Sequence, residues 1–465
     1  MIEFCIQIHT DLKQDLIIKE LLRRIDRLEA EVKDLRKENL YLRSELEKYK
    51  HTKNSSNSHM PPSKDENRPQ RNQSLREKSD KTIGGQAGHE GKTLMMVDHP
   101  TETQKEMPDY CSQCGKDLIE VEGVFVERKQ VIDIPPIKPV YKEYQIYSKM
   151  CCCGHTTVSK FPHGVIAPIQ YGANTEALVS YLHSRQYLPF RRMEEFMNDV
   201  FHLPISEGGL HCLLNRFTDK ARFLYEEIKN RIEKSESIGT DETGAKVNGK
   251  KHWYWTWQSE NLTYIHHSLN RGIKTIQDVF ENGLPNSILQ HDRWASHFHC
   301  QAKGHQLCTS HLLRDLNYLE ELYKNEWAGN MKKILKQAIE LKKILLPNQY
   351  SQHFEPKIKI EDDLDKLLNQ PIDTSCKKII TLQKYLNKHR SNILLFLYHP
   401  KVPPDNNGSE RSIRNVKVKQ KISGQFKSDK GAEIYAINRS VIDTIIKSKQ
   451  NVLQGLNLIA DFNSD

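Results

Sequence analysis

Residues 237–257 read SIGTDETGAKVNGKKHWYWTW and predict a β-hairpin. Asn248 and Gly249 suit a tight type I′ turn, because both residue types tolerate a positive φ. Beyond the turn, tryptophan occupies every second position, which is the period of a half-buried strand. These residues are Trp253, Trp255 and Trp257. We therefore expect two paired strands, with the tryptophans in a core rather than in a row that stacks on DNA.

The first strand of this hairpin carries two adjacent acids, Asp241 and Glu242. An unpaired carboxylate is costly to bury, so acids in a core strand need a reason to be there. Adjacent residues of a strand point to opposite faces of the sheet, so the two acids cannot both enter one site.

Length and composition limit the class of protein. A chain of 465 residues is too long for one core and should divide into several domains. A net charge of +9 favours an anionic partner without defining it. We expect no membrane helix and no secretory signal, because long apolar runs and a basic first segment are both missing. Ten clustered cysteines favour metal binding in a reducing cytoplasm over a disulfide framework.

Residues 1–50 predict a coiled-coil dimerisation zipper. β-branched residues dominate heptad position a and leucine fills position d, which favours two parallel strands, while one Asn at a fixes register and dimer state. The residues are Ile18, Ile25, Val32, Asn39 and Leu46 at a, and Leu21, Leu28, Leu35 and Leu42 at d. Four pairs between positions g and e join opposite charges, namely Arg24–Glu29, Glu31–Arg36, Glu38–Arg43 and Glu45–Lys50. The alternative is an amphipathic helix packed on its own domain; we expect a parallel homodimer.

Residues 51–109 predict a flexible, mildly basic linker. From His51 to about Met95, Asn, Ser, Lys, Gly and Gln predominate and aromatic residues are almost missing. Such a composition cannot bury enough apolar surface to order itself. A basic run of this kind can contact a DNA backbone, but usually it is only solvated.

Residues 110–165 predict a zinc-ribbon-like module. CSQCG at 111–115 and CCCG at 151–154 each end in a glycine that permits a tight knuckle. The alternating stretches 124–134 and 141–149 predict strands between the knuckles. Paired thiolates on two knuckles suit a closed, structural Zn²⁺ site. We expect the ligands to be Cys111, Cys114, Cys151 and Cys153, with His155 as a substitute in the irregular second pair and free buried thiols as the alternative.

Residues 166–234 predict helices. Apolar residues recur at helical spacing from Phe190 to Val200, the pattern then breaks, and Ser206 can cap a second helix. Two helices around a short turn resemble a helix-turn-helix, which places its second helix in a DNA major groove. An ordinary helical hairpin fits the spacing at least as well.

Three acids stand apart from the surface charge. Asp241 lies in the hairpin, Asp292 closes the short apolar run NSILQHD, and Glu410 lies in VPPDNNGSERSIRNVKVKQK at 402–421. The carboxyl end of a buried strand is where ligand sites gather in α/β sheets. Carboxylates on two strands and a helix suit a two-metal phosphoryl-transfer site, because Mg²⁺ prefers carboxylate oxygen.

The segment around Glu410 is also basic. Residues 401–430 hold eight basic and three acidic residues, and such a patch attracts phosphates. We expect DNA contacts from Arg411, Arg414, Lys417, Lys419 and Lys421. The alternative is that Glu410 and Arg414 form a simple i,i+4 pair on a solvated helix.

Three motifs together resemble the bacterial DDE transposases of the insertion sequence 66 family. They are DETGAKVNGKKHWYW at 241–255, CTSHLLRDL at 308–316 and PPDNNGSERSIRNVKVKQK at 403–421. The resemblance extends over nearly the whole chain. It implies a multidomain α/β protein with a ribonuclease-H-like catalytic core at 235–440, an all-helical insertion at about 306–399, and a C-terminal helical tail at 441–465.

The resemblance also implies an activity and its residues. That activity is Mg²⁺- or Mn²⁺-dependent DNA cleavage at transposon ends, followed by joining of the 3′-hydroxyl to target DNA. By position, Asp241, Asp292 and Glu410 match the catalytic triad of the family. Glu242 is then left for the opposite face, where we expect it to pair with a nearby Lys.

One motif departs from the family. The usual C-W-A-H-x-R-R reads CTSHLLR here, so a Trp and one Arg are missing. Cys308, His311 and Arg314 remain, either as support for the active site or as packing residues of a helix. The expected setting is the bacterial cytoplasm at the nucleoid, with accessory proteins as further partners. The alternatives to a transposase are an inert, dimeric, zinc-containing DNA-binding regulator and a coiled-coil assembly protein.

Overall fold

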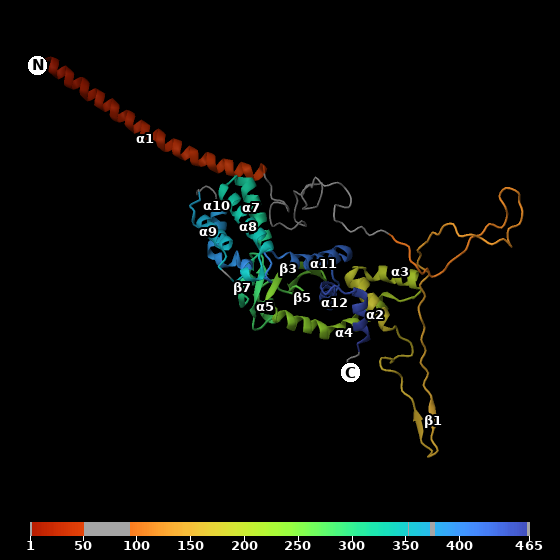
Figure 1. The fold of residues 1–465 in the computed structure, drawn as a ribbon. Helices are drawn as coiled ribbons and strands as arrows, with labels where there is room; N and C mark the ends of the chain where they lie inside the picture. The colour runs from red at the N-terminus through yellow and green to blue at the C-terminus, as the bar shows by residue number, and fades with distance from the viewer. Residues whose placement is uncertain (1, 51–93, 352, 373–376, 463–465) are drawn as a thin grey trace.

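A computed structural model describes residues 2–50, 94–351, 353–372 and 377–462 of the chain (Figure 1). Residues 51–93, most of the predicted linker, lie outside this range. The described part combines a five-stranded mixed sheet with many helices, so the prediction of a multidomain α/β fold is confirmed at this level. Within this part, none of the helices combines the length and the apolar composition needed to cross a membrane.

The sheet has its central strand in the predicted hairpin. Its strands are β3 (Ser237–Val247), β4 (Lys250–Gln258), β5 (Thr263–Ser268), β6 (Leu284–His291) and β7 (Ala302–Leu307). They lie in the order β5-β4-β3-β6-β7. The first three are antiparallel neighbours, whereas β3, β6 and β7 run parallel. The hairpin therefore supplies the strand on which both halves of the sheet are built.

The predicted turn of this hairpin is confirmed. Val247 pairs with Lys250, so the loop has two residues. Asn248 has φ of 45° and Gly249 has φ of 77°, and two positive φ angles are what a type I′ turn requires.

The prediction that β4 is only half-buried is wrong. Trp255 and Trp257 are buried on one face of the sheet, and Tyr254 and Thr256 are buried on the other. Aromatic and β-branched residues on both faces pack against two separate layers of helix. The alternation of tryptophan therefore reflects two buried faces rather than one.

Helices cover the two faces of the sheet. On one face, α11 (Asn407–Ser423) and α12 (Asp429–Lys447) pack on the hairpin through a cluster of Val247, Tyr254, Ile265, Val416, Phe426 and Tyr435. On the other face, the buried tryptophans meet α4 (Glu207–Glu233), α5 (Ile273–Val279) and α13 (Val452–Asp461) through Phe217, Tyr225, Ile276 and Ile459. The sheet is thus the middle layer of three.

The predicted boundary between the catalytic domain and a C-terminal tail, at 440–441, falls inside α12. Val441 and Ile442 are buried in the same cluster as the tryptophans, and Leu456 of α13 joins them. The prediction of helix is confirmed, but the prediction of a separate tail is wrong, because these helices complete the core.

The helices before the sheet agree with the sequence. They are α2 (Ala173–Ser180), a π-helical turn (Tyr181–Arg185), α3 (Phe190–Phe201) and α4. Ser206 caps α4, because its Oγ accepts a hydrogen bond from the Gly209 amide at 3.2 Å. Buried side chains run along α4 from Leu210 to Ile232, so one face of this helix packs in the core over most of its length. A helix-turn-helix role for α3 and α4 stays a prediction.

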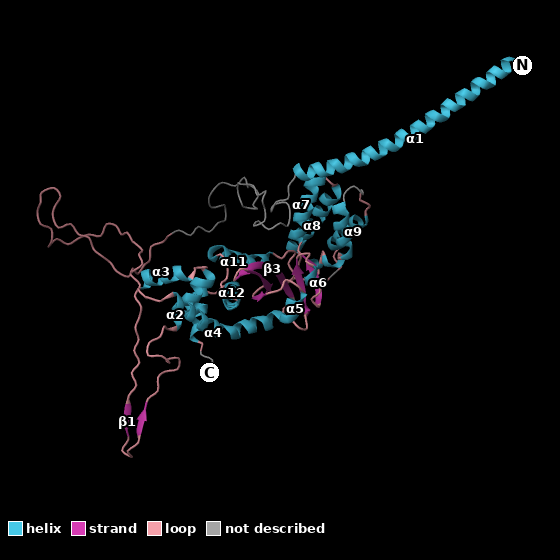
Figure 2. Cartoon of the chain, turned by 180° about the vertical axis from the view of Figure 1, so that it is seen from behind, coloured by secondary structure: helices cyan, strands magenta, loops and turns pink. Residues whose placement is uncertain are grey.

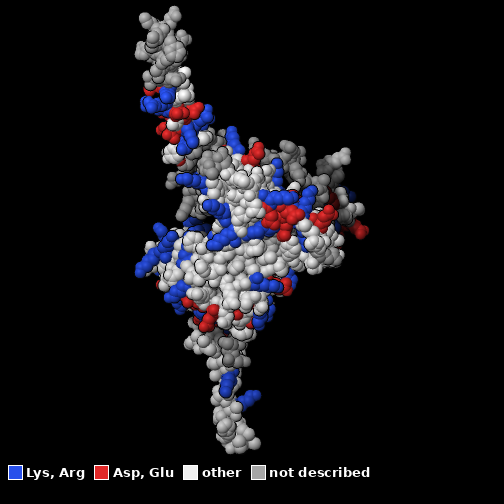
Figure 3. Space-filling model, turned by 90° about the vertical axis from the view of Figure 1, so that its left-hand side faces the viewer, with Lys and Arg blue, Asp and Glu red and all other residues white. Residues whose placement is uncertain are grey.

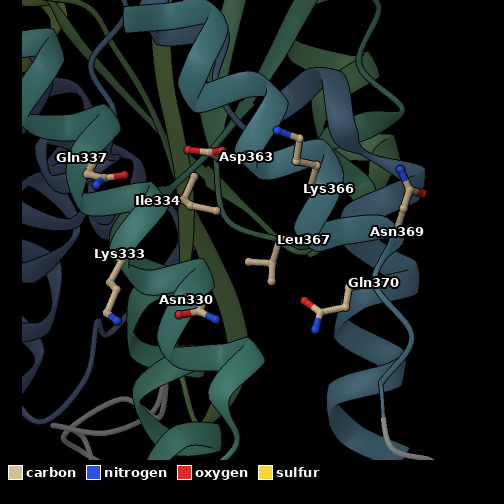
Figure 4. A pocket seen from close by; sticks show the side chains of 9 residues that line it. All are labelled: Asn330, Lys333, Ile334, Gln337, Asp363, Lys366, Leu367, Asn369 and Gln370. Atoms are coloured by element: carbon tan, nitrogen blue, oxygen red, sulfur yellow. The ribbon is translucent and has the colours of Figure 1, made fainter.

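A helical insertion follows β7, as expected. Its helices are α7 (Thr309–Tyr323), α8 (Glu326–Ile344), α9 (Glu355–Asn369) and α10 (Lys377–Lys388). They share a core that includes Leu316, Trp327, Leu335, Leu364 and Leu382 and that continues onto Ile288 of β6 and Leu307 of β7. A groove of about 610 Å³ separates α8 from α9 and is lined by polar side chains such as Lys333 and Asp363 (Figure 4). None of the predicted site residues lines it.

The amino-terminal helix α1 (Ile2–Lys50) is continuous and points away from the rest of the chain (Figure 1). Its predicted heptad residues are exposed along their length, and Leu35, for example, is 62% exposed. The helix is confirmed, and the residues that the structure describes leave its zipper face exposed.

Residues 94–169 form extended loops that leave the body of the protein (Figure 2). The only strands described there are β1 (Ser148–Met150) and β2 (Thr156–Val158), which pair as a short hairpin. The prediction of strands at 124–134 and 141–147 is wrong. An alternating segment needs a partner strand and a covering layer, and here residues such as Val131, 94% exposed, have neither.

Candidate active site

The register of the central strands explains why two distant acids meet. β3 pairs in parallel with β6, with Gly239 opposite Gln290. Two residues further along both strands, the same register brings Asp241 level with Asp292, which directly follows β6. Two of the three predicted acids therefore lie at one edge, where parallel strands present ligand sites.

A close approach of α11 to β3 brings in the third acid. A Cβ at Gly239 would lie 2.6 Å from Asn406 Oδ1 and 2.7 Å from Ser409 Oγ, so only glycine fits there. The Asn406 Nδ2 donates to the Thr240 carbonyl at 2.7 Å, and Ser409 Oγ donates to Asn406 Oδ1 at 2.7 Å. These buried bonds fix the first turn of α11, and Glu410 is the next residue.

The other two carboxylates act on Asp241. The pKa of Asp241 is raised well above its ordinary value, first because burial disfavours its charge and then because of the negative charges of Glu242, Asp292 and Glu410. The Glu242 amide donates to Asp241 Oδ1 at 2.9 Å and partly offsets this. Asp292 Oδ1 accepts from the Trp294 amide at 2.8 Å, which orients that carboxylate.

Two arginines and a histidine surround Glu410. Arg314 Nη2 lies 3.4 Å from Glu410 Oε1, and Arg414 Nη2 lies 3.5 Å from Oε2. His311 Nδ1 lies 3.8 Å from Oε1, and the pKa of His311 is lowered by burial and then by the charge of Arg314. The structure thus places His311 and Arg314 beside the third acid, and their supporting role stays a prediction.

Cys308 packs where the end of β6 and the starts of α7 and α11 meet. Its thiol is buried and accepts a hydrogen bond from the Asn406 amide at 3.2 Å, and its own amide donates to the His291 carbonyl at 2.9 Å. Burial raises the pKa of the Cys308 thiol to about 12, so the group is neutral. Of the two roles left open by the sequence, the contacts of Cys308 favour packing.

Glu242 is buried on the opposite face, and among the described residues no lysine pairs with it. Arg271 Nε lies 2.9 Å from Oε1, and His297 Nε2 lies 3.1 Å from Oε2. Burial works to raise the pKa of Glu242, but the bonds from His297 and Arg271 outweigh it and leave that pKa lowered. The prediction of a lysine partner is wrong, because the tertiary fold brings Arg271 and His297 to this face.

His297 is a residue that the sequence reasoning missed. It lies in the short helix α6 (Ala295–Phe298), is fully buried, and its Nε2 lies 3.8 Å from Asp292 Oδ1 as well as near Glu242. The signal that could have indicated it is the histidine-rich stretch HDRWASHFH at 291–299, which begins next to Asp292.

The basic residues of α11 divide by burial. Arg411, Arg414 and Lys421 are exposed, whereas Lys417 donates to the Gly244 carbonyl. Lys419 is buried, and its Nζ donates to the carbonyl groups of His183 and Leu188. Burial lowers the pKa of Lys419 to about 7. The prediction of Lys419 as a DNA contact is therefore wrong, since the inner face of α11 packs on the core.

The four predicted zinc ligands do not form one group in this structure. All four thiols are free, and hydrogen bonds within each knuckle lower the pKa of Cys111, first from the backbone at Cys114, and the pKa of Cys151, first from the backbone at Cys153. Gly115 and Gly154 have φ of 72° and 82°, as tight knuckles need. Cys151 and Cys153 lie in the turn between β1 and β2, and among the described residues the four cysteines do not form a group with metal-ligand spacing. The zinc site stays a prediction.

The fold and the site thus define the class of protein. It is an α/β protein in which carboxylates from two strands and a helix lie together at one edge of the sheet. The chain belongs to the Transposase IS66 family, whose model matches residues 168–434, more than half of its length. No curated protein matches the chain significantly. The matched range begins before α2 and ends within α12, so it includes all three acids.

The donor set at this edge fits a hard divalent cation. Carboxylate oxygens are the ligands that Mg²⁺ prefers. Mutual repulsion contributes to the raised pKa of Asp241, and a cation between the carboxylates would relieve it. Asp241, Asp292 and Glu410 are therefore the residues that could hold such an ion.

Proposed function

We propose that this chain is a DDE transposase that binds the ends of an insertion sequence, cleaves DNA there, and joins the 3′-hydroxyl to target DNA. The observation that carries the proposal is the convergence of Asp241, Asp292 and Glu410 in a member of the Transposase IS66 family. In this account the three residues are the catalytic triad.

Two Mg²⁺ or Mn²⁺ ions would be held by the triad, and when bound such ions activate the attacking oxygen and stabilise the leaving oxygen at phosphorus. The chain's own part is to hold the acids in place. The Trp294 amide orients Asp292, and the Asn406–Ser409 bonds orient the turn that carries Glu410. Water and then a DNA 3′-hydroxyl attack directly, so the chain supplies no covalent nucleophile.

The exposed residues of α11 are the proposed contacts to DNA phosphates. Arg411, Arg414 and Lys421 share the helix that carries Glu410, and Lys417 lies at its inner edge. Phosphate contacts of this kind position a duplex without reading its sequence. On the face drawn in Figure 3, Lys and Arg side chains are spread over much of the surface, and acidic side chains lie among them in several smaller patches, which agrees with the net positive charge.

The catalytic core is proposed to be ribonuclease-H-like, with the helices at 309–388 as its insertion. What supports this is the five-stranded mixed sheet, in which the central strand carries the first acid and the adjacent parallel strand leads into the second. The insertion begins directly after β7 and ends before α11, so it separates the second acid from the third.

The amino-terminal helix is proposed to pair two copies in parallel. Its exposed a and d residues would be buried against the same residues of the second copy, and opposite charges would meet between positions g and e. Pairing of this kind would bring two catalytic domains to two DNA ends. The cysteine knuckles are proposed to close around Zn²⁺, and accessory proteins complete the assembly at the cytoplasmic nucleoid.

The test is Mg²⁺- or Mn²⁺-dependent cleavage and strand transfer by the full chain on DNA ends that flank its gene. We expect wild type to be active and Asp292→Asn to be inactive while still binding the ends. Equal cleavage and strand transfer by the two proteins would contradict the enzyme proposal and favour the inert DNA-binding regulator. Inverted repeats beside the gene would point to the enzyme, and their absence to the regulator.

A further inference from the structure

A second cluster of ligand-type side chains lies outside the triad. Among the residues that the structure describes, His252, His267 and Asp429 are the one group of His, Cys, Asp or Glu residues whose ligand atoms all lie within 4.8 Å of one another. They come from β4, β5 and the first turn of α12. No role in the proposed chemistry accounts for them.

The geometry of the cluster resembles an open coordination site. His252 Nδ1 lies 2.9 Å from His267 Nε2 and 3.3 Å from Asp429 Oδ1. Ligand atoms about 2.0 Å from a tetrahedral Zn²⁺ lie about 3.3 Å from each other, so the observed spacings are close to what one shared ion requires. His252 is 6% exposed while Asp429 is 74% exposed, so the cluster is anchored inside and open to solvent on one side.

The sheet explains why the two imidazoles meet. His267 pairs with Tyr254 across β4 and β5, so His252 is its diagonal neighbour on the same face. The two rings stack with centroids 5.1 Å apart and planes 14° apart. The third ligand comes from the N-terminus of α12, which Ser428 caps through the Gly431 amide.

The cluster is separate from the triad. Asp241 pairs with Thr256, whereas His252 pairs with Ala245, four residues further along β3. At about 3.3 Å per residue the two places are about 13 Å apart along the strand. An ion at one place would therefore have no ligand in common with an ion at the other.

We propose that His252, His267 and Asp429 bind one transition-metal ion of the Zn²⁺ class, which ties the β4–β5 strands to the start of α12. Two imidazoles and one carboxylate suit Zn²⁺, Co²⁺ or Ni²⁺ and not Mg²⁺, which takes oxygen ligands. Three protein ligands leave the remaining position to water.

The location gives this ion a structural role. The link between α11 and α12 is already bound to the hairpin tip, because the Asn248 amide donates to the Phe426 carbonyl and the Phe426 amide to the Lys246 carbonyl, both at 2.9 Å. The Tyr254 hydroxyl donates to the Ala432 carbonyl at 2.9 Å. The ion would reinforce this connection, which follows the helix that carries Glu410.

The test is titration of metal-free full chain with Co²⁺, read by absorption, for wild type, His267→Gln and Asp429→Asn. Cysteine sites give a thiolate charge-transfer band in the near ultraviolet, whereas the proposed site gives only the weaker visible bands. We expect each variant to lose one equivalent of Co²⁺, or to bind it at least about tenfold more weakly, with the thiolate band unchanged.

Two neighbours serve as controls, because His266→Gln changes the adjacent histidine on the other face and Glu433→Gln changes an exposed acid one turn further along α12. Both should bind Co²⁺ as wild type does. Asp429 is exposed and Ser428 still caps the helix, so Asp429→Asn should keep the melting temperature of the metal-free chain. Equal Co²⁺ binding by all five proteins, or displacement of Co²⁺ by equimolar Mg²⁺, would overturn the proposal.

Discussion

The sheet core and the amino-terminal third of the chain differ in whether their patterned apolar residues are buried. In the core, Trp255 and Tyr254 are buried on opposite faces of one strand by helices of the same chain. In α1 and in the loops at 94–169, apolar residues such as Leu35 and Val131 stay exposed. Patterns in the first region are satisfied by long-range contacts within the chain, whereas those in the second are not covered by the residues that the structure describes, and for α1 we propose a second copy as the cover.

The largest expected effect concerns the triad in the core. Glu410→Gln keeps the size of the side chain and removes the charge that would hold a cation. We expect metal-dependent strand transfer to fall on the order of 10⁴-fold, as for other residues that act as one catalytic unit. Glu433→Gln, an exposed acid on α12, is the matched control and should keep wild-type rates. Equal losses in both variants would contradict a specific role for Glu410.

The next effect concerns α1, for which we propose a second copy as the partner. Leu28→Lys places a charge at a d position, whereas Leu40→Lys places the same charge at the outer b position of an equally exposed leucine. Losing two buried leucines per dimer should weaken pairing by at least about 100-fold. Sedimentation should show monomers for Leu28→Lys and dimers for Leu40→Lys. Identical oligomeric states in the two variants would disprove the heptad register.

The joint between β3 and α11 should show a moderate effect on stability. Asn406→Ala removes the bond to the Thr240 carbonyl and leaves buried polar groups without partners, which costs about 1–3 kcal/mol of unfolding free energy. Asn407→Ala, one position along and only partly buried, should cost much less. Urea unfolding would measure both. A similar small cost in the two variants would show that the joint is not held by Asn406.

The last effect is a pH dependence in the core. Burial lowers the pKa of Lys419 to about 7 in the folded chain, below the ordinary value of 10.5 that the unfolded chain keeps. Between these values the unfolded state binds more protons, so stability should rise as pH increases from about 7 to about 10, by at most about 1.4 kcal/mol per pH unit.

Lys419→Met should remove this part of the slope, and Lys421→Met, at an exposed position of the same helix, should keep it. Chemical unfolding at several pH values measures the slope for each variant. An unchanged slope in Lys419→Met would mean that this amine is not neutral in the folded chain.

Much of the core could be predicted because its signals are local. The Asn248-Gly249 turn, the Ser206 cap and the short strand before Asp292 each depend on neighbouring residues, and each is confirmed. The three acids were selected by a resemblance to a family, and the structure brings them together through strand register and the glycine at 239.

The remaining features depend on tertiary contacts that the sequence does not display. The partners of Glu242 lie 29 and 55 residues away along the chain, so the sequence does not show that Arg271 and His297 contact it. Lys419 looks like its basic neighbours on α11, and only the packing of that helix buries it. The strands predicted at 124–134 failed because alternation alone supplies no pairing partner.

The central claim is that three carboxylates from two strands and a helix hold the catalytic ions. Anomalous scattering from Mn²⁺ in crystals of the full chain bound to its DNA ends tests this most directly. The account predicts manganese between Asp241, Asp292 and Glu410, at the edge where β6 ends and α11 begins. Manganese elsewhere, with those three carboxylates unbound beside the DNA, would contradict it.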